Sequence, residues 1–119
     1  MRVSAQIIAQ PGAQRAEQNG AVTVPGGDGQ VEAIRELTGG RGVDAAFDIV
    51  GAAPTIKTAQ ATIAQGGRLT VVGIAGGTVE WNFFSAPYES ILTNTYWGTI
   101  EDLHDVAAMY RAGQISPDV

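Results

Sequence analysis

The sequence of 119 residues is 45% hydrophobic and 16% charged, with a formal net charge of −5, a balance typical of one folded globular domain. The acidic balance excludes a nucleic-acid partner, because phosphate binding needs clustered lysine and arginine, and no apolar run approaches the roughly 18 residues of a membrane span. Cysteine is absent and histidine occurs once, so disulfides and thiolate chemistry are excluded, a zinc site is not expected, and the composition favours a cytoplasmic protein.

Short strands and helices alternate in the first part of the chain. Residues 2–9 contain the β-branched side chains typical of a strand. Val31, Ile34 and Leu37 recur at helical spacing, which predicts a helix with one apolar face. The predicted elements are a strand at 2–9, a helix at 13–19, a strand at 21–24, and a helix with Asp28 as its N-cap that ends at 39–40.

An apolar run between two glycine pairs is the most informative stretch of the chain. Residues 69–74 are rich in β-branched side chains and lie between the pairs at 66–67 and 76–77. This pattern is typical of a strand buried on both faces of a parallel sheet. Gly73 lies near the carboxyl end of the run, where ligands bind in open α/β sheets, and its missing side chain lets a ligand approach the backbone.

The second half of the chain continues the alternation, which predicts a right-handed parallel α/β layer. Thr99 and Asp102 have the spacing of a capped helix start. The predicted elements are a strand at 43–50, a helix from Pro54 to residue 66, a strand at 69–74, a strand or loop at 78–84, a strand at 91–97, and a helix that begins at Thr99. The residues expected to line the inner face of the last helix are Leu103, Val106, Ala107 and Tyr110.

One stretch matches the dinucleotide fingerprint G-x-G-x-x-A, at residues 40–45. A functional fingerprint follows a strand and opens a helix, so that the phosphate meets the helix N-terminus. Here the match follows a predicted helix and opens a predicted strand. We therefore interpret residues 40–45 as a connecting loop.

Several segments in a fixed order resemble the cofactor domain of medium-chain, zinc-type alcohol dehydrogenases, with the NAD-dependent alcohol dehydrogenases as the most similar members. The matching segments are 31–44, 47–51, 66–77 and 95–99. The resemblance implies an α/β fold with a partial Rossmann-like three-layer sheet, mostly parallel, that lacks the first strand and the glycine-rich turn. Residues 1–119 would then form a single partial nucleotide-binding domain, from the second strand onward.

The resemblance also implies where a nicotinamide dinucleotide contacts this chain. In the family, the carboxyl ends of the fourth and fifth strands lie beside the adenosine and the nicotinamide riboside, and the last strand offers backbone groups to the carboxamide. An acidic residue after the second strand holds the ribose hydroxyls; its nearest counterpart here is Gln10, which leaves the choice between NAD and NADP open. The implied cofactor-binding residues are Gln10, Val50, Gly51, Val72, Gly73, Ile74, Thr95 and Trp97.

Two departures from the family pattern lower the activity expected of this chain. The first strand and its turn are missing, so a pyrophosphate has no helix N-terminus to bind. The zinc ligands and proton relay of the family's catalytic domain have no counterpart in this sequence. We therefore expect this chain to bind no zinc and to supply no catalytic residue, and we expect weak or absent binding of NAD or NADP by this chain alone. The expected function is part of the cofactor domain of an NAD(P)-dependent, alcohol dehydrogenase-like oxidoreductase, either a fragment of a longer enzyme or a natural truncation, and inactive alone.

A second function class follows from the same missing strand. That strand normally lies between the two halves of the sheet, and its absence leaves unpaired edges of the kind that pair with another chain. Related enzymes also use their last strand, 91–97 here, in a subunit contact. The alternative is therefore a non-catalytic module that forms a homodimer through an exposed sheet edge or binds another partner.

The remaining polar candidates have structural interpretations. His104 falls on the last helix beside acidic residues and is expected at the surface, because a lone imidazole has no visible catalytic partner. Asp44 and Asp48 share one face of a strand. One interpretation is a carboxylate pair for acid–base chemistry; the interpretation that we favour is a structural role for Asp48. Four aromatic residues form a stacking patch or, as we favour, pack a loop onto the sheet or onto a partner: Trp81, Phe83, Phe84 and Tyr88.

Overall fold

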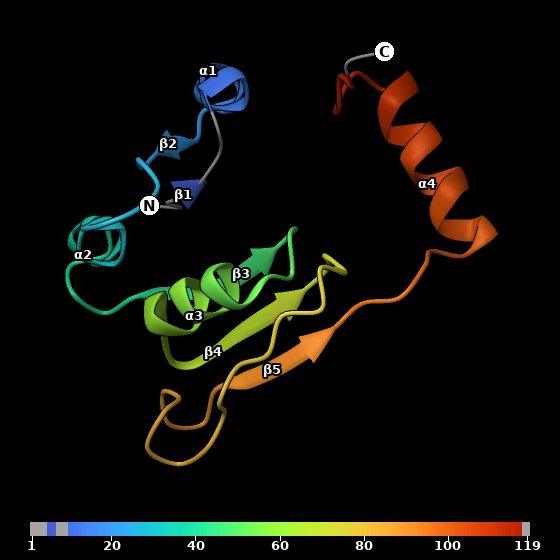
Figure 1. Ribbon diagram of the computed structural model, residues 1–119. Helices are drawn as coiled ribbons and strands as arrows, with labels where there is room; N and C mark the ends of the chain where they lie inside the picture. Colours follow the sequence, from blue (N-terminus) through green and yellow to red (C-terminus); the bar gives the residue numbers. More distant parts are fainter. Residues whose placement is uncertain (1–4, 7–9, 118–119) are drawn as a thin grey trace.

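Strands and helices alternate along the chain, as the sequence predicts (Figure 1). The computed structural model describes residues 5–6 and 10–117. Every strand pair among these residues is parallel, which confirms the predicted α/β, Rossmann-like class. The elements are β1 (Ala5–Gln6), α1 (Gln10–Gln18), β2 (Val22–Thr23), α2 (Gln30–Leu37), β3 (Val43–Asp48), α3 (Ala53–Thr62), β4 (Ile63–Val71), β5 (Ile91–Asn94) and α4 (Ile100–Arg111).

The described strands form two separate sheets. β1 pairs with β2 in one sheet, and β3, β4 and β5 pair in that order in the other. A doubly wound fold has the strand order 3-2-1-4-5-6, and the two sheets correspond to the groups 3-2 and 4-5-6 of that order. The break between the sheets therefore falls at the position of the first strand, the strand that the sequence is expected to lack.

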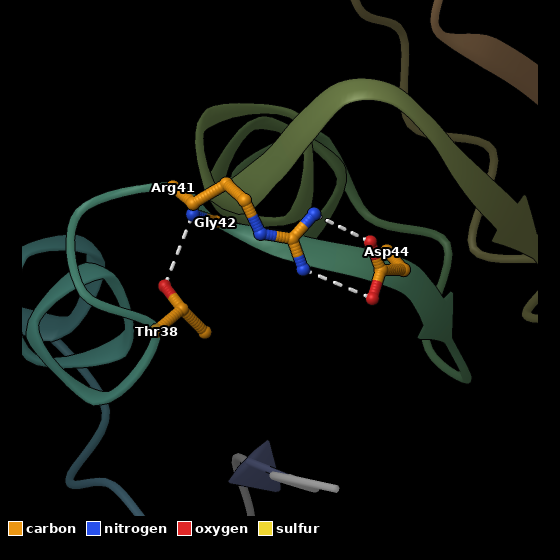
Figure 2. A network of polar contacts seen from close by, with 4 residues as sticks. All are labelled: Thr38, Arg41, Gly42 and Asp44. Carbon is orange, nitrogen blue, oxygen red and sulfur yellow. Dashed lines mark hydrogen bonds and ion pairs between the residues drawn. The ribbon is translucent and has the colours of Figure 1, made fainter. Parts of the chain in front are cut away.

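The stretch 40–45 spans the end of the connection between α2 and β3 and the start of β3, and polar side chains hold it in place (Figure 2). The Thr38 hydroxyl accepts a hydrogen bond from the Gly42 amide at 3.0 Å, and the Arg41 guanidinium donates two bonds to the Asp44 carboxylate at 2.6 and 3.0 Å. These bonds, together with the charge of Arg41, hold the pKa of Asp44 below its ordinary value. The stretch follows a helix and opens a strand, as predicted: residues 40–42 form the connection, and residues 43–45 are the first residues of β3.

α3 packs against one face of the three-stranded sheet. Ile56 of the helix and Ile63 and Leu69 of β4 form the buried centre of this layer. Successive side chains of a strand point to opposite faces, and on the other face Phe47 of β3 is 68% exposed. The sheet therefore has one face covered by a helix and an apolar side chain in solvent on the other.

β4 begins earlier than the sequence predicts. The helix ends at Thr62 and the strand begins at Ile63, before the glycine pair rather than after it. The pairing with β3 shifts register within this stretch, which includes Gly66 at a φ of 72°. The physical reason lies in another helix, because the Arg35 guanidinium of α2 donates to the Ala61 carbonyl at 2.7 and 3.0 Å and satisfies the end of α3.

α4 has the predicted start but not the predicted burial. The Thr99 hydroxyl accepts from the Asp102 amide at 3.1 Å, and the Asp102 carboxylate accepts from the Thr99 amide at 2.7 Å. The backbone and side-chain hydrogen bonds from Thr99 hold the pKa of Asp102 below its ordinary value. Leu103 is 67% exposed and Tyr110 is 57% exposed, so the expectation of an inner face is wrong. The reason is that the described part of the chain places no element over that face (Figure 1).

The chain exposes more surface than a compact domain of its size. Its radius of gyration is 15.3 Å, whereas a compact domain of this length has about 13.5 Å. Its solvent-accessible surface is 8725 Å², whereas a compact monomer of the same mass has about 6,100 Å². None of the described helices is long and apolar enough to cross a membrane.

Candidate functional site

The segments that follow β3 and β4 lie side by side at the carboxyl edge of the sheet. We call this surface the edge wall and define it as residues 49–53 and 72–77. Four backbone hydrogen bonds extend the parallel pairing beyond the strands: Val72 N and Gly73 N to Asp48 O at 2.8 and 3.0 Å, Ala75 N to Val50 O at 3.2 Å, and Gly77 N to Gly51 O at 2.8 Å. The two segments therefore form one continuous surface rather than two independent loops.

Three glycines allow this close approach. A Cβ on Gly73 would lie 2.0 Å from the carbonyl carbon of Val50, and a Cβ on Gly51 would lie 2.2 Å from the carbonyl oxygen of Gly73. A Cβ on Gly77 would lie 2.2 Å from the amide nitrogen of Ala53. The space beside Gly73, which the sequence suggests for a ligand, is thus occupied by the chain's own backbone, because that glycine brings the two segments together.

Asp48, the last residue of β3, organises the turn into α3. Its side chain is almost fully buried, with 5% of the residue exposed. Oδ1 accepts from the amides of Val50 and Gly51 at 2.9 and 3.0 Å, and Oδ2 accepts from the Thr55 hydroxyl at 2.8 Å. The carboxylate lies at the amino end of α3, where the helix dipole stabilises a negative charge.

These hydrogen bonds make the turn unsuitable for a phosphate. Phosphate sites at helix N-termini need free backbone amides and a positive potential. The Val50 and Gly51 amides already donate to Asp48, whose negative charge lies where a phosphate would be. The edge wall therefore suits an uncharged part of a ligand.

Apolar side chains on the edge wall are in contact with solvent. Val50 is 53% exposed, Val72 is 39% exposed and Ile74 is 91% exposed. Folded proteins do bear single exposed apolar residues, but three on adjacent segments form a patch. The carboxyl edge of an open parallel sheet is the usual place for a ligand, so this patch is a candidate binding surface.

The segment after β5 continues this edge. The Thr95 amide donates to the Val71 carbonyl at 3.1 Å, which places Thr95 beside the end of β4. Trp97 is 78% exposed and contacts Tyr96 edge to face, with ring centroids 5.9 Å apart. Three strand ends thus lie next to one another at one edge.

Most of the residues implied to bind a cofactor lie at this edge. The edge wall contains Val50, Gly51, Val72, Gly73 and Ile74. Thr95 adjoins it, and Trp97 lies between β5 and α4. Gln10 is the first residue of α1, the element that comes after β1 along the chain, and its side chain lies outside the described residues. Contact of any of them with a cofactor stays a prediction.

Sequence reasoning missed the residues that build the edge wall from beneath. Asp48 was assigned only a general structural role, Gly77 was noted only as part of the glycine pair after the apolar run, and Thr55 was not singled out. An aspartate at a strand end, followed within three residues by glycine and then by a helix, is the pattern of a side chain that binds nearby backbone amides. That signal is present in the sequence and identifies the turn.

The described residues provide neither an acid–base pair nor a metal centre. Asp44 pairs with Arg41, Asp48 is buried, and four residues along a strand separate their Cα atoms by about 13 Å. His104 is exposed on α4. No three His, Asp or Glu side chains among the described residues form a group that fits a metal ion, so these residues do not fit the zinc of the family's catalytic domain.

Comparison with known proteins assigns the chain to a family. The model of the zinc-binding dehydrogenase family matches residues 3–111. D-arabinose 1-dehydrogenase (NADP(+)) from Saccharolobus solfataricus is 33% identical over 85 residues, which cover 71% of this chain and 24% of that protein. Zinc-type alcohol dehydrogenase B from Aspergillus flavus is 33% identical over 54 residues, 45% of this chain and 13% of that protein. The matches therefore span a quarter or less of the length of these relatives.

Solved structures agree with this assignment. The D-arabinose dehydrogenase from Sulfolobus solfataricus aligns with a TM-score of 0.83 and 27% identity over 98% of this chain and 36% of that chain. The alcohol dehydrogenase from Aeropyrum pernix aligns with a TM-score of 0.80 and 27% identity over 93% of this chain and 32% of that chain. The chain belongs to the zinc-binding dehydrogenase family.

Proposed function

We propose that this chain forms the nicotinamide side of an NAD(P) cleft in an alcohol dehydrogenase-like oxidoreductase. The observation that carries the proposal is the edge wall, where Val50, Val72 and Ile74 are exposed beside two tightly paired strand ends. The nicotinamide ring of a reduced cofactor and its ribose carry no charge. The amides of the turn already donate to a carboxylate, which disfavours a phosphate at the edge wall. An uncharged ring and ribose are therefore the parts of the cofactor that suit this surface.

The role we assign to the chain is to position the cofactor. In its oxidised form, a bound nicotinamide would accept the hydride when an alcohol is oxidised to a carbonyl compound, and the hydroxyl proton would leave to solvent. The edge wall would orient the ring and keep water from one of its faces. We assign no catalytic residue, because His104 is exposed on α4 and Asp44 and Asp48 bind other groups. A cytoplasmic location stays a prediction from composition.

Titration with NADH, followed by nicotinamide fluorescence and by quenching of Trp97, tests this function. We expect a dissociation constant of roughly 10⁻⁴ to 10⁻³ M, because the edge wall holds no phosphate group. The same titration with NADPH decides between the two cofactors. No binding of either cofactor in this range contradicts the proposal.

A matched pair of variants locates the binding surface. Ile74→Glu places a charge on the edge wall and should abolish detectable binding. Phe84→Glu is the control, because Phe84 is 92% exposed and Ile74 is 91% exposed, so neither change is expected to disturb folding. Equal binding by the two variants would place the cofactor elsewhere.

We propose self-association through an exposed sheet edge as the second candidate function. The accessible surface of 8725 Å² exceeds that of a compact monomer by roughly 2,600 Å², and each partner in a stable interface buries about 800 Å². The outer edge of β3 pairs with no other strand among the described residues, and such edges recruit strands.

Size-exclusion chromatography with light scattering tests the second candidate. A homodimer has twice the mass of the 12.3 kDa chain. Phe47→Lys adds a charged side chain to the edge strand β3, which disfavours edge-to-edge pairing, and should return the protein to a monomer, whereas Phe84→Lys should leave the dimer intact. A monomer at the highest attainable concentration contradicts self-association and leaves the cofactor proposal untouched.

A further inference from the structure

Asp48 binds both halves of the edge wall. Its carboxylate accepts from the amides of Val50 and Gly51 in the first half. Its backbone carbonyl accepts from the amides of Val72 and Gly73 in the second half, at 2.8 and 3.0 Å. A displacement of this one residue would therefore move both halves.

The carboxylate is buried among donors that fix its orientation. Removing an ionised carboxylate from water is costly unless its lone pairs are satisfied. Two amides and the Thr55 hydroxyl provide that satisfaction within 3.0 Å. Charge-assisted hydrogen bonds of this kind are stronger than neutral ones, so the turn is held in one conformation.

We propose that Asp48 is a positioning residue, whose buried carboxylate holds the β3–α3 turn so that the edge wall is formed before a ligand arrives. Its importance for the cofactor rests on the function proposed above. The part that concerns the geometry of the turn stands on the hydrogen bonds alone. A wall formed in advance lowers the ordering cost of binding.

Thr55 shows how an asparagine could replace the aspartate. The Thr55 hydroxyl accepts from the Ala52 amide at 3.2 Å and lies 2.9 Å from the Ala52 carbonyl oxygen. Its single proton has two possible acceptors, the Asp48 carboxylate and that carbonyl. In Asp48→Asn the new amide would donate to the Thr55 hydroxyl, whose proton would turn to Ala52. Asp48→Asn therefore preserves the three contacts, and Asp48→Ala removes them.

Amide hydrogen exchange measured by NMR tests the geometry. In Asp48→Ala the protection of the Ala75 and Gly77 amides should fall at least about tenfold relative to the amides within β4, because their acceptors lie on the turn. Asp48→Asn should stay within about threefold of the parent protein. The control is Asp44→Asn, an exposed change on the same strand that should leave these amides unchanged. Unchanged protection in Asp48→Ala, or an equal loss throughout β4, overturns the proposal.

A milder variant covers the case in which Asp48→Ala fails to fold. Thr55→Val removes one of the three bonds and should lower the protection of Ala75 and Gly77 by a smaller factor, which Thr55→Ser should restore. Unchanged protection in Thr55→Val counts against the proposal in the same way.

NADH binding separates the two claims. If the parent protein binds no NADH, the proposed function fails while amide exchange still decides the role of Asp48 in the turn. If the parent protein binds NADH, Asp48→Ala should weaken binding about tenfold and Asp48→Asn less than threefold. Unweakened binding by Asp48→Ala with a loosened edge wall overturns the role in cofactor positioning.

Discussion

β4 and α4 carry similar apolar side chains, yet only those of β4 are buried. Ile63 and Leu69 have 0% exposure, whereas Leu103 and Val106 are 67% and 51% exposed. β4 has a strand on each side and α3 over one face, while α4 lies apart from the sheet (Figure 1). The difference teaches that an apolar pattern defines which face of an element can be buried, and that a second layer decides whether it is.

This contrast also divides the two functions that we propose. The edge wall extends from the buried part of the molecule, so its backbone is well placed to hold a ligand. α4 and the outer face of β3 offer exposed apolar side chains, which suit a partner surface. Substitutions that act on one region and spare the other sharpen the comparison.

The largest effect is expected from Gly73→Ala. The added Cβ would lie 2.0 Å from the carbonyl carbon of Val50, and a packed backbone cannot yield that far, so the free energy of unfolding should fall by more than about 4 kcal/mol. Gly76→Ala is the control: its φ is 75° and no atom lies within 4 Å of the added Cβ, so it should cost only about 1–2 kcal/mol. Urea unfolding followed by circular dichroism measures both. Equal losses would show that the two segments are not in contact in solution.

A second comparison uses the same substitution in each region. Leu69→Ala should lower the free energy of unfolding by about 3 kcal/mol, because it opens a cavity in the core. Leu103→Ala should change it by less than about 0.5 kcal/mol, because that side chain is 67% exposed. Thermal and urea unfolding measure the two variants. A loss above about 1.5 kcal/mol for Leu103→Ala would mean that α4 packs against a partner in solution.

Local signals were sufficient for much of the fold. The Thr99–Asp102 spacing predicted the start of α4 because a capping interaction involves residues three apart. The stretch 40–45 was correctly rejected as a dinucleotide fingerprint because its neighbours fix the order of helix and strand. Both signals lie within a few residues of the feature that they predict.

Long-range contacts account for what sequence reasoning missed. The carbonyl of Ala61 at the end of α3 accepts hydrogen bonds from the side chain of Arg35, which belongs to another helix. Gly73 is required by the backbone of Val50, which follows a different strand. The candidate edge could be located from the order of strands, but its internal support by Asp48 depends on how the turn folds beneath it.

Thr99→Ala should loosen α4 while leaving the sheet intact. The change removes the N-cap hydrogen bond and should cost about 1 kcal/mol of local helix stability. Because α4 buries none of its residues, the loss should stay local, seen as faster amide exchange in its first turn with little change in the urea midpoint. Thr78→Ala, in an exposed loop, is the control. A matching fall in the protection of β4 would break the comparison by showing that the two regions unfold together.

The smallest effect is the pH dependence of the same helix start. Hydrogen bonds from Thr99 hold the pKa of Asp102 below its ordinary value, so the folded state binds this proton less readily than the unfolded state, whose pKa is about 3.9. The stabilisation by Asp102 is therefore complete above about pH 4 and is lost as the pH falls through the lower folded-state pKa. The effect is small because the carboxylate is exposed and screened by solvent. An NMR titration of the first-turn amides should show fraying on acidification, which Asp102→Asn abolishes and Asp105→Asn preserves. Fraying on a rise in pH instead, or an unchanged titration in Asp102→Asn, would show that the cap does not hold α4.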